Sequence, residues 1–212
     1  MRKFRFVDSE IYHIYNRGVD KRDIFIKEED YFRFIHSLYE LNDANAVINS
    51  GLNCNNNLEL ETKENRKLLV EIIIFTLMPN HFHLILKQKM EKGIEKFMHK
   101  LGTGYTLYFN QKQKRSGSLF QGRYKAKIVD NNIYFSHIPF YIHSNPLKLN
   151  YRGSTSLEFL ESYRWSSFLD YIGIMNYPSV TNRSLILNYF GDEQTYKREF
   201  LNWLKIKEVE PR

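Results

Sequence analysis

The spacing of apolar residues changes along the first half of the chain, and each spacing predicts one element. Alternation over Ile11–Tyr15 predicts a strand that ends at the turn signal of residues 16–18. Apolar residues at helical spacing follow the acidic residues 28–30 and predict a helix. The apolar run 68–77 is typical of a strand buried on both faces, and a turn over residues 78–80 joins it to a second strand over residues 81–87. These two strands are expected to form a hairpin.

The second half of the chain continues this alternation of helices and strands. A helical stripe runs from Ile94 to Tyr108, and a short strand is expected over residues 124–129. A helical segment then ends by Asn145, because Pro146 disfavours helical angles in the residue before it. Pro139 either kinks this helix or starts a shorter one. The order βαββαβα predicts an α+β fold, a ferredoxin-like antiparallel sheet with helices packed on it.

We expect one compact catalytic domain over residues 1–172 and a helical C-terminal extension over residues 173–212. Residues 42–66 are rich in Asn and weakly periodic, so they are interpreted as an exposed insertion. In the extension, Gly191 separates two segments, and Asp192 is a candidate N-cap for a helix whose Tyr196, Phe200, Trp203 and Leu204 face inward.

Composition removes several classes of protein. Hydrophobic residues make up 42% of the chain, which is enough for a core, and the single Cys54 excludes an internal disulfide or a cysteine zinc cluster. The longest apolar run, 72–77, is too short to span a membrane, so a soluble cytoplasmic protein without membrane contact is expected. Residues 102–104 lack the Gly-Lys-Ser/Thr of a phosphate-binding loop, so no nucleotide cofactor is expected.

The charge pattern favours a polyanionic partner. The chain has 31 Lys plus Arg against 24 Asp plus Glu, and the run from Lys96 to Lys127 contains cations but no acidic residue. A merely solvated face is the alternative interpretation. If the partner is DNA, cations can contact phosphates and an aromatic ring can stack on unpaired bases. The predicted DNA-binding residues are Arg17, Lys100, Lys112, Lys114, Arg115, Arg123, Tyr124, Lys125 and Lys127.

Two histidines on the predicted hairpin are candidates for chemistry. His81 and His83 are two residues apart on a strand, so both imidazoles project from one face while Phe82, Leu84 and Leu86 point into the core. Two imidazoles can converge on one ion, but they can equally be structural histidines that form hydrogen bonds.

A nucleophile and a third ligand are available further along the chain. Tyr141 and Asn145 are four residues apart and share a helical face, and the Asn carbonyl can bind a hard cation. A tyrosine beside a metal could form a covalent bond to a phosphoryl group. Tyr134 is the reserve candidate for the nucleophile, and Tyr105 and Tyr124 also compete for that role.

Five strings in this order resemble one known family: YHIYNRGVDKRDIF, LMPNHFHLIL, GSLFQGRYKAKIVD, YIHSNPLK and YRWSSFLDYIG. The chain is similar to the REP-associated tyrosine transposases, a branch of the single-tyrosine HUH transposases, over residues 10 to about 173. Its Pro139 departs from the pattern that is usual in the family's tyrosine helix.

The resemblance implies that His81 and His83 bind Mg²⁺ or Mn²⁺, that Asn145 completes the metal shell and that Tyr141 is the nucleophile. It further implies a DNA strand transferase that cuts single-stranded, hairpin-bearing DNA, forms a 5′ phosphotyrosine link and releases a 3′ hydroxyl. Insertion-sequence relatives pair up, so a homodimer and a monomer are both open.

Two other functions compete with this one. A ferredoxin-like module that binds single-stranded DNA or RNA without cutting it would also explain the charge and the aromatic residues. A nuclease with an acidic triad of Asp8, Glu71 and Asp130 is the second rival, but nothing in the spacing of these carboxylates demands that they converge.

Overall fold

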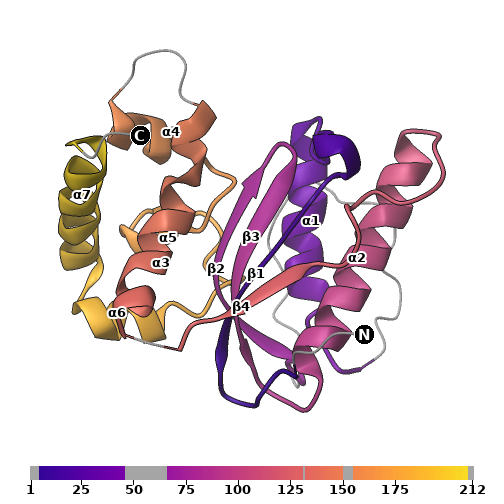
Figure 1. Cartoon of the computed structure of the whole chain (residues 1–212), viewed down its shortest axis with the longest axis horizontal. Helices are drawn as coiled ribbons and strands as arrows, with labels where there is room; N and C mark the ends of the chain where they lie inside the picture. Colours follow the sequence, from indigo (N-terminus) through magenta and orange to yellow (C-terminus); the bar gives the residue numbers. More distant parts are fainter. Residues whose placement is uncertain (1–4, 46–65, 131, 150–154, 210–212) are drawn as a thin grey trace.

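The structure of the chain is a computed structural model, and it describes residues 5–45, 66–130, 132–149 and 155–209. A central sheet separates two helical layers, with α1 and α2 on one face and α3 to α7 on the other (Figure 1). His81 and His83, which the sequence singles out for chemistry, project from the face of the sheet that the second layer covers.

The sheet has the predicted topology. Its strands are β1 (Ile11–Arg17), β2 (Val70–Met78), β3 (His81–Gln88) and β4 (Lys125–Ile128), in the spatial order β2-β3-β1-β4. All neighbouring strands are antiparallel, and β2 and β3 form the expected hairpin. The α+β, ferredoxin-like prediction is therefore confirmed, as is the βαββαβα order.

One face of the sheet is covered by α1 (Glu28–Glu40) and α2 (Gly93–Lys112). Alternate residues of the strands point into this core, because side chains of a strand alternate between its two faces. Phe82, Leu84 and Leu86 of β3 are buried there together with Tyr12 and Ile14 of β1. The outward side chains of β3 are thereby fixed on the other face.

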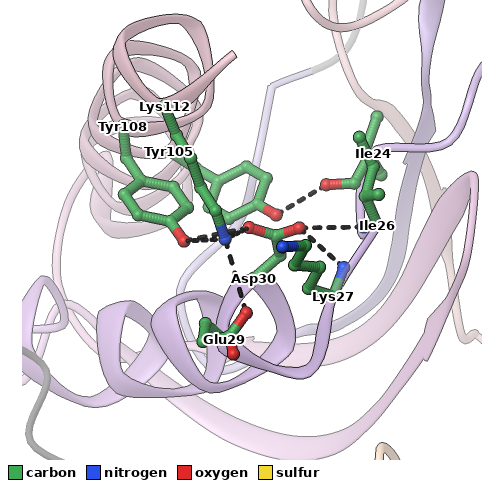
Figure 2. Close-up of polar contacts among 8 residues, drawn as sticks. All are labelled: Ile24, Ile26, Lys27, Glu29, Asp30, Tyr105, Tyr108 and Lys112. Carbon is green, nitrogen blue, oxygen red and sulfur yellow. Dashed lines mark hydrogen bonds and ion pairs between the residues drawn. The ribbon is translucent and has the colours of Figure 1, made fainter.

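A buried acid ties α1 to α2 within this layer. Asp30 has a fully buried side chain and accepts hydrogen bonds from the backbone N–H groups of Ile26 and Lys27, from the Tyr108 hydroxyl and from Lys112 Nζ (Figure 2). Burial raises the pKa of Asp30, but these hydrogen bonds outweigh it and hold the pKa below its ordinary value. The carboxylate therefore stays ionised inside the protein.

The second layer starts with α3 (Asn132–Ser144), which continues into the 3-10 turn η2 (Asn145–Leu149). Four further helices follow it and share a second apolar core with α3, the sheet residues Ile73, Ile74 and Ile85 among its members. These helices are α4 (Ser156–Ser162), α5 (Phe168–Tyr171), α6 (Ser184–Phe190) and α7 (Glu193–Val209). The core includes residues on both sides of the domain boundary expected at residue 172, so the extension packs on the same layer as α3.

Several local expectations differ from the structure. β1 extends to Arg17, two residues beyond the predicted end, because it pairs with β3 as far as His81. Pro139 lies inside a continuous α3, so a helix that starts at this proline is wrong. Asn42 is not exposed: its side chain is buried and exchanges two hydrogen bonds with the backbone of Val70. Most of the predicted insertion, residues 46–65, lies outside the described residues.

Most expectations for the C-terminal extension agree with the structure. Asp192 Oδ1 accepts a hydrogen bond from the backbone N–H of Thr195 at 2.7 Å, which confirms it as the cap of α7. Tyr196, Phe200 and Leu204 are buried as predicted, whereas Trp203 is only partly buried. Within the described ranges, no helix is long and apolar enough to cross a membrane.

Candidate active site

Strand register gathers the candidate residues on the face that α3 covers. Tyr15 pairs with His83 and Arg17 pairs with His81 across β1 and β3, and residues directly opposite each other share a face of the sheet. His13 lies two residues before Tyr15 and therefore on the same face. On the other side of β1, Lys125 pairs with Tyr15 and Lys127 with His13. Three histidines, a tyrosine and three cations thus share one face.

The side chain of His83 is held by His13. His13 Nε2 lies 2.8 Å from His83 Nδ1, and both rings are buried. If His83 binds a metal through Nε2, its Nδ1 carries the proton and donates to His13. The Nδ1 of His13 then carries its own proton and faces the Tyr134 hydroxyl at 3.4 Å. In these tautomers, the hydrogen bonds that link His83, His13 and Tyr134 leave Nε2 of His83 free.

His81 is oriented in the same way by the turn that precedes it. Its Nδ1 lies 2.6 Å from Asn80 Oδ1, and Asn80 Nδ2 donates to the backbone carbonyl of Lys21, which fixes the amide. The Nε2 of His81 is left for a ligand. The ring centroids of His81 and His83 are 5.1 Å apart, closer than the roughly 7 Å that separates residues two apart along a strand.

The three imidazoles are neutral at physiological pH. Burial, and next the charge of Lys127, lowers the pKa of His13 to about 4. Burial, Lys148 and Arg17 lower the pKa of His81 to about 4, and burial together with the neighbouring His13, His81 and Lys148 lowers that of His83 well below its ordinary value. A neutral imidazole carries the lone pair that a metal needs.

The pair of Nε2 atoms fits a divalent cation, but the described residues do not bring a complete ligand set together. No group of three or more His, Cys, Asp or Glu side chains in the described ranges could hold a metal ion. Asn145 Oδ1, the predicted third ligand, accepts a hydrogen bond from Lys148 Nζ at 2.8 Å, while Asn145 Nδ2 donates to the carbonyl of Tyr141. The amide oxygen is free for a cation only after Lys148 moves.

Tyr141 lies beside the histidines with an accessible ring. Its side chain is 43% exposed, and its ring centroid is 6.1 Å from that of His83 and 6.5 Å from that of His13. Lys148 Nζ lies 5.7 Å from the centre of the same ring. By contrast, Tyr134 is partly buried and burial raises its pKa, which disfavours its phenolate. Of the two tyrosines, Tyr141 is therefore better placed to attack a bound strand.

Two clefts open on this face and share Tyr15, His83 and Tyr141. The first has a volume of about 550 Å³, and it brings Arg17, Lys21, Lys125 and Lys148 around the histidines, with no carboxylate among its described lining residues. The second has a volume of about 720 Å³ and extends toward α7. A polyanion could cross both clefts and pass over Tyr141.

Part of the chain matches a known protein family. Residues 59–145 match the family model described as "Transposase IS200 like", a range that includes His81, His83, Tyr141 and Asn145. The match covers less than half of the chain. The predicted resemblance to the tyrosine transposases and the predicted enzyme class are confirmed by this match.

One solved structure supports the same fold over most of the chain. A REP-associated tyrosine transposase bound to a REP hairpin shares 13% identity with a TM-score of 0.54, over 86% of this chain and 92% of that one. A structure from Deinococcus radiodurans described as a transposase has 15% identity and a TM-score of 0.39, over 67% of this chain and 95% of that one. No curated protein matches the sequence significantly.

Five of the predicted DNA-binding residues line clefts. Arg17 and Lys125 line the first cleft, and Lys127 lies over the ring of Tyr134 in the second. Arg123 and Tyr124 line a separate cleft of about 860 Å³ beside α2. Lys114 is exposed just after α2.

The other predicted cations form contacts within the fold. Lys112 pairs with Asp30, Lys100 donates to the carbonyls of Asp43 and Asn45, and Arg115 bonds Asn110 and the carbonyl of Ser118. For all nine predicted residues a role in DNA binding stays a prediction.

Sequence reasoning missed three residues of this site. Lys148 stands in the YIHSNPLK string, but nothing in its spacing shows that it would bond Asn145. His13 and Tyr15 have the alternation that places them on the histidine face, yet only the pairing of β1 with β3 shows which histidine they meet. Alternation within β1 and proximity to the turn at residues 16–18 are the signals that could have found them.

Proposed function

We propose that this chain is a metal-dependent DNA strand transferase that cleaves and rejoins single-stranded, hairpin-bearing DNA through a 5′-phosphotyrosine intermediate on Tyr141. The observation that carries the proposal is the accessible Tyr141 ring beside the neutral imidazoles of His81 and His83, at the junction of two clefts that present cations. The name of the similar solved structure, which is bound to a REP hairpin, supports DNA as the partner.

The reaction assigns a role to each residue near the junction. Tyr141 Oη attacks the scissile phosphorus, a new O–P bond forms, and the bond from phosphorus to the 3′ oxygen breaks. The phenol loses its proton and the departing 3′ oxygen gains one, so a free 3′ hydroxyl and a phosphotyrosine remain. Rejoining reverses these steps with another 3′ hydroxyl. Because the phosphotyrosine conserves the bond energy, no nucleoside triphosphate is needed.

His81 and His83 would hold the metal through Nε2, with Asn145 Oδ1 as the third ligand once Lys148 releases it. A bound Mg²⁺ or Mn²⁺ supplies a Lewis acid that offsets the charge of a nonbridging phosphate oxygen. Nitrogen ligands favour Mn²⁺ over Mg²⁺. Lys148 lies near both the Tyr141 ring and the histidines, so the same ammonium can turn from Asn145 to a phosphate of the bound strand.

The deciding experiment compares Tyr141→Phe with Tyr134→Phe. We expect Tyr141→Phe to bind an end-labelled hairpin oligonucleotide with unchanged affinity but to form no covalent adduct on a denaturing gel, because only the attacking oxygen is lost. Tyr134→Phe should still form the adduct, since it removes one hydroxyl next to His13 and no nucleophile. If the adduct persists in Tyr141→Phe and disappears in Tyr134→Phe, the nucleophile is Tyr134.

The same gel separates the strand transferase from a module that only binds nucleic acid. A wild-type chain that shifts the oligonucleotide in a native gel but yields no adduct with Mg²⁺ or Mn²⁺ would establish the binding module instead. Adduct formation that is abolished by EDTA and restored by Mn²⁺ is the outcome that the proposal requires.

A further inference from the structure

The second cleft on the active-site face has walls that the proposed strand-transfer chemistry does not use. It has a volume of about 720 Å³, within the range of roughly 300 to 1,000 Å³ that ligand pockets commonly have. One wall is Tyr141 with His13 and His83, so the cleft starts at the reacting tyrosine. Trp203, Ile206 and Lys207 of α7 also line the cleft.

The helix α7 presents two different faces. Tyr196, Phe200 and Leu204 recur at a spacing of four and are buried in the second core. Trp203 and Lys207 form another such pair, and Ile206 lies next to them, 61% exposed. An apolar side chain this exposed contributes little to folding. Its place in a cleft beside an aromatic ring suggests that this face of α7 contacts a ligand.

The cleft combines aromatic surface with positive charge. Trp203 is only partly buried, and Tyr134 lies on the sheet side with Lys127 Nζ 4.1 Å from the centre of its ring. Lys127 and Lys207 are cations of this cleft, and its described lining residues include no Asp or Glu. Aromatic rings beside cations form the combination that binds unpaired nucleotides, since the ring stacks on a base while the cation meets a phosphate.

We propose that this cleft binds one unpaired nucleotide of the DNA strand, next to the phosphate that Tyr141 attacks. Its base packs against Trp203 and Ile206, and its phosphate lies near Lys127 or Lys207. This assignment rests on the proposed function, because it takes Tyr141 as the point where the strand crosses from the first cleft to the second. A paired base does not fit the role, because stacking partners within a duplex already cover its faces.

The test uses hairpin oligonucleotides that carry one abasic position at a time along the unpaired flanks. Affinity is measured in the non-cleaving Tyr141→Phe chain, with and without the further change Trp203→Ala. At one position next to the cleavage site, loss of the base should weaken binding roughly 5- to 100-fold when Trp203 is present, the range expected for one stacked base. In the Trp203→Ala chain the same loss should cost less than about twofold.

A second measurement keeps the test valid if Trp203→Ala disturbs the packing of α7. The chain has two tryptophans, and Trp165 is buried, so a change of emission upon DNA binding reports mainly on Trp203. Oligonucleotide with the base present should quench this emission, and the abasic oligonucleotide should not. In Trp203→Phe the change of emission should disappear, while the abasic penalty should be largely retained because the ring still stacks.

The outcomes separate this inference from the proposed function. Covalent adduct in the wild-type chain, together with an abasic penalty that is equal with and without Trp203, would overturn the nucleotide site and leave the strand transferase intact. A penalty that depends on Trp203, in a chain that never forms adduct, would support the nucleotide site and overturn the transferase. If neither the intact nor any abasic oligonucleotide quenches the tryptophan emission, the nucleotide site is also overturned.

Discussion

His83 illustrates how one hydrogen bond can prepare a metal ligand. An imidazole binds a metal through the nitrogen that has no proton, and its other nitrogen needs an acceptor to keep the proton there. In the tautomer with the proton on His83 Nδ1, His13 Nε2 is that acceptor, 2.8 Å away on the neighbouring strand. His13 is therefore a positioning residue: it would act on the metal only through the tautomer and the ring orientation of His83.

We expect His13→Ala to weaken Mn²⁺ binding by roughly 10- to 100-fold, because loss of an outer-sphere partner commonly costs that much metal affinity. His13→Gln should recover part of the loss, since its amide oxygen can accept the same hydrogen bond. Binding is measured by titration of DNA-free protein with Mn²⁺ and detection of the free ion by electron paramagnetic resonance. His99→Gln, an exposed change on α2, is the matched control.

Equal Mn²⁺ affinity in wild type, His13→Ala and the control would contradict a positioning role. Equal loss in His13→Ala and His13→Gln, with unchanged unfolding free energy, would show that the ring itself matters rather than the accepted hydrogen bond.

The sequence predicted the residues whose role depends on local spacing. Two histidines on one strand and a tyrosine four residues before an asparagine are local patterns, and the structure places His81, His83 and Tyr141 on one face. The partners of these residues were missed because they depend on strand register and on how a turn folds back. His13 is 70 residues from His83, and the Lys148 contact to Asn145 forms inside a 3-10 turn that the periodicity does not predict.

At the scale of elements, some cations of the run from Lys96 to Lys127 line clefts, whereas others form contacts that hold the fold together. Lys112 is the last residue of α2, and its Nζ lies 2.7 Å from the buried Asp30 of α1. Burial lowers the pKa of Lys112, but the hydrogen bond to Asp30 outweighs it and raises the pKa above its ordinary value. The pair therefore joins two helices (Figure 2). Lys114, two residues later, is exposed.

We expect Lys112→Met to lower the free energy of unfolding by about 1–3 kcal/mol, because it leaves the Asp30 carboxylate buried with neutral partners only. Urea unfolding followed by circular dichroism measures this change. Lys114→Met, the matched control, should leave stability within about 0.5 kcal/mol of wild type. If Lys112→Met instead keeps full stability and weakens DNA binding more than Lys114→Met, the lysine is a DNA contact and not a helix connector.

The sequence predicted the helices and strands well wherever apolar periodicity was strong. It did not predict the residues at which an element ends and the next segment begins. The hairpin of β2 and β3 follows from a continuous apolar run with a turn in it, and the structure confirms it. The end of β1 depended on pairing with β3 as far as His81, which no local pattern in residues 11–18 reveals. Asn42 looked like part of a polar insertion because the backbone of Val70 that it bonds is 28 residues away.

In the whole molecule, a buried histidine connects the helical layer to the sheet. His143 Nδ1 lies 2.7 Å from the Tyr196 hydroxyl of α7, and its Nε2 lies 2.9 Å from Ser167 Oγ. Ser167 in turn bonds the backbone of Phe75 in β2. Tyr141 is two residues away on the same helix, so this network also holds the candidate nucleophile over the sheet.

The same network should make the fold sensitive to acid. Burial lowers the pKa of His143 to about 3, whereas an unfolded histidine has a pKa near 6.5. Between these values the unfolded chain binds a proton that the folded chain excludes, so stability is constant above about pH 7 and falls as the pH drops. The loss is up to about 1.4 kcal/mol per pH unit for each such histidine, and His13 and His81, whose pKa values burial also lowers to about 4, add to it.

We expect His143→Gln to reduce the pH dependence of unfolding by as much as one proton, whatever its stability at pH 7.5, because glutamine does not titrate. The free energy of unfolding in urea, measured at several pH values from 7.5 to 5, gives the slope for wild type, His143→Gln and the exposed control His99→Gln. A slope that His143→Gln leaves unchanged, or that His99→Gln reduces equally, would mean that His143 is already protonated in the folded chain. Its two hydrogen bonds would then need a charged imidazole as donor to both Tyr196 and Ser167.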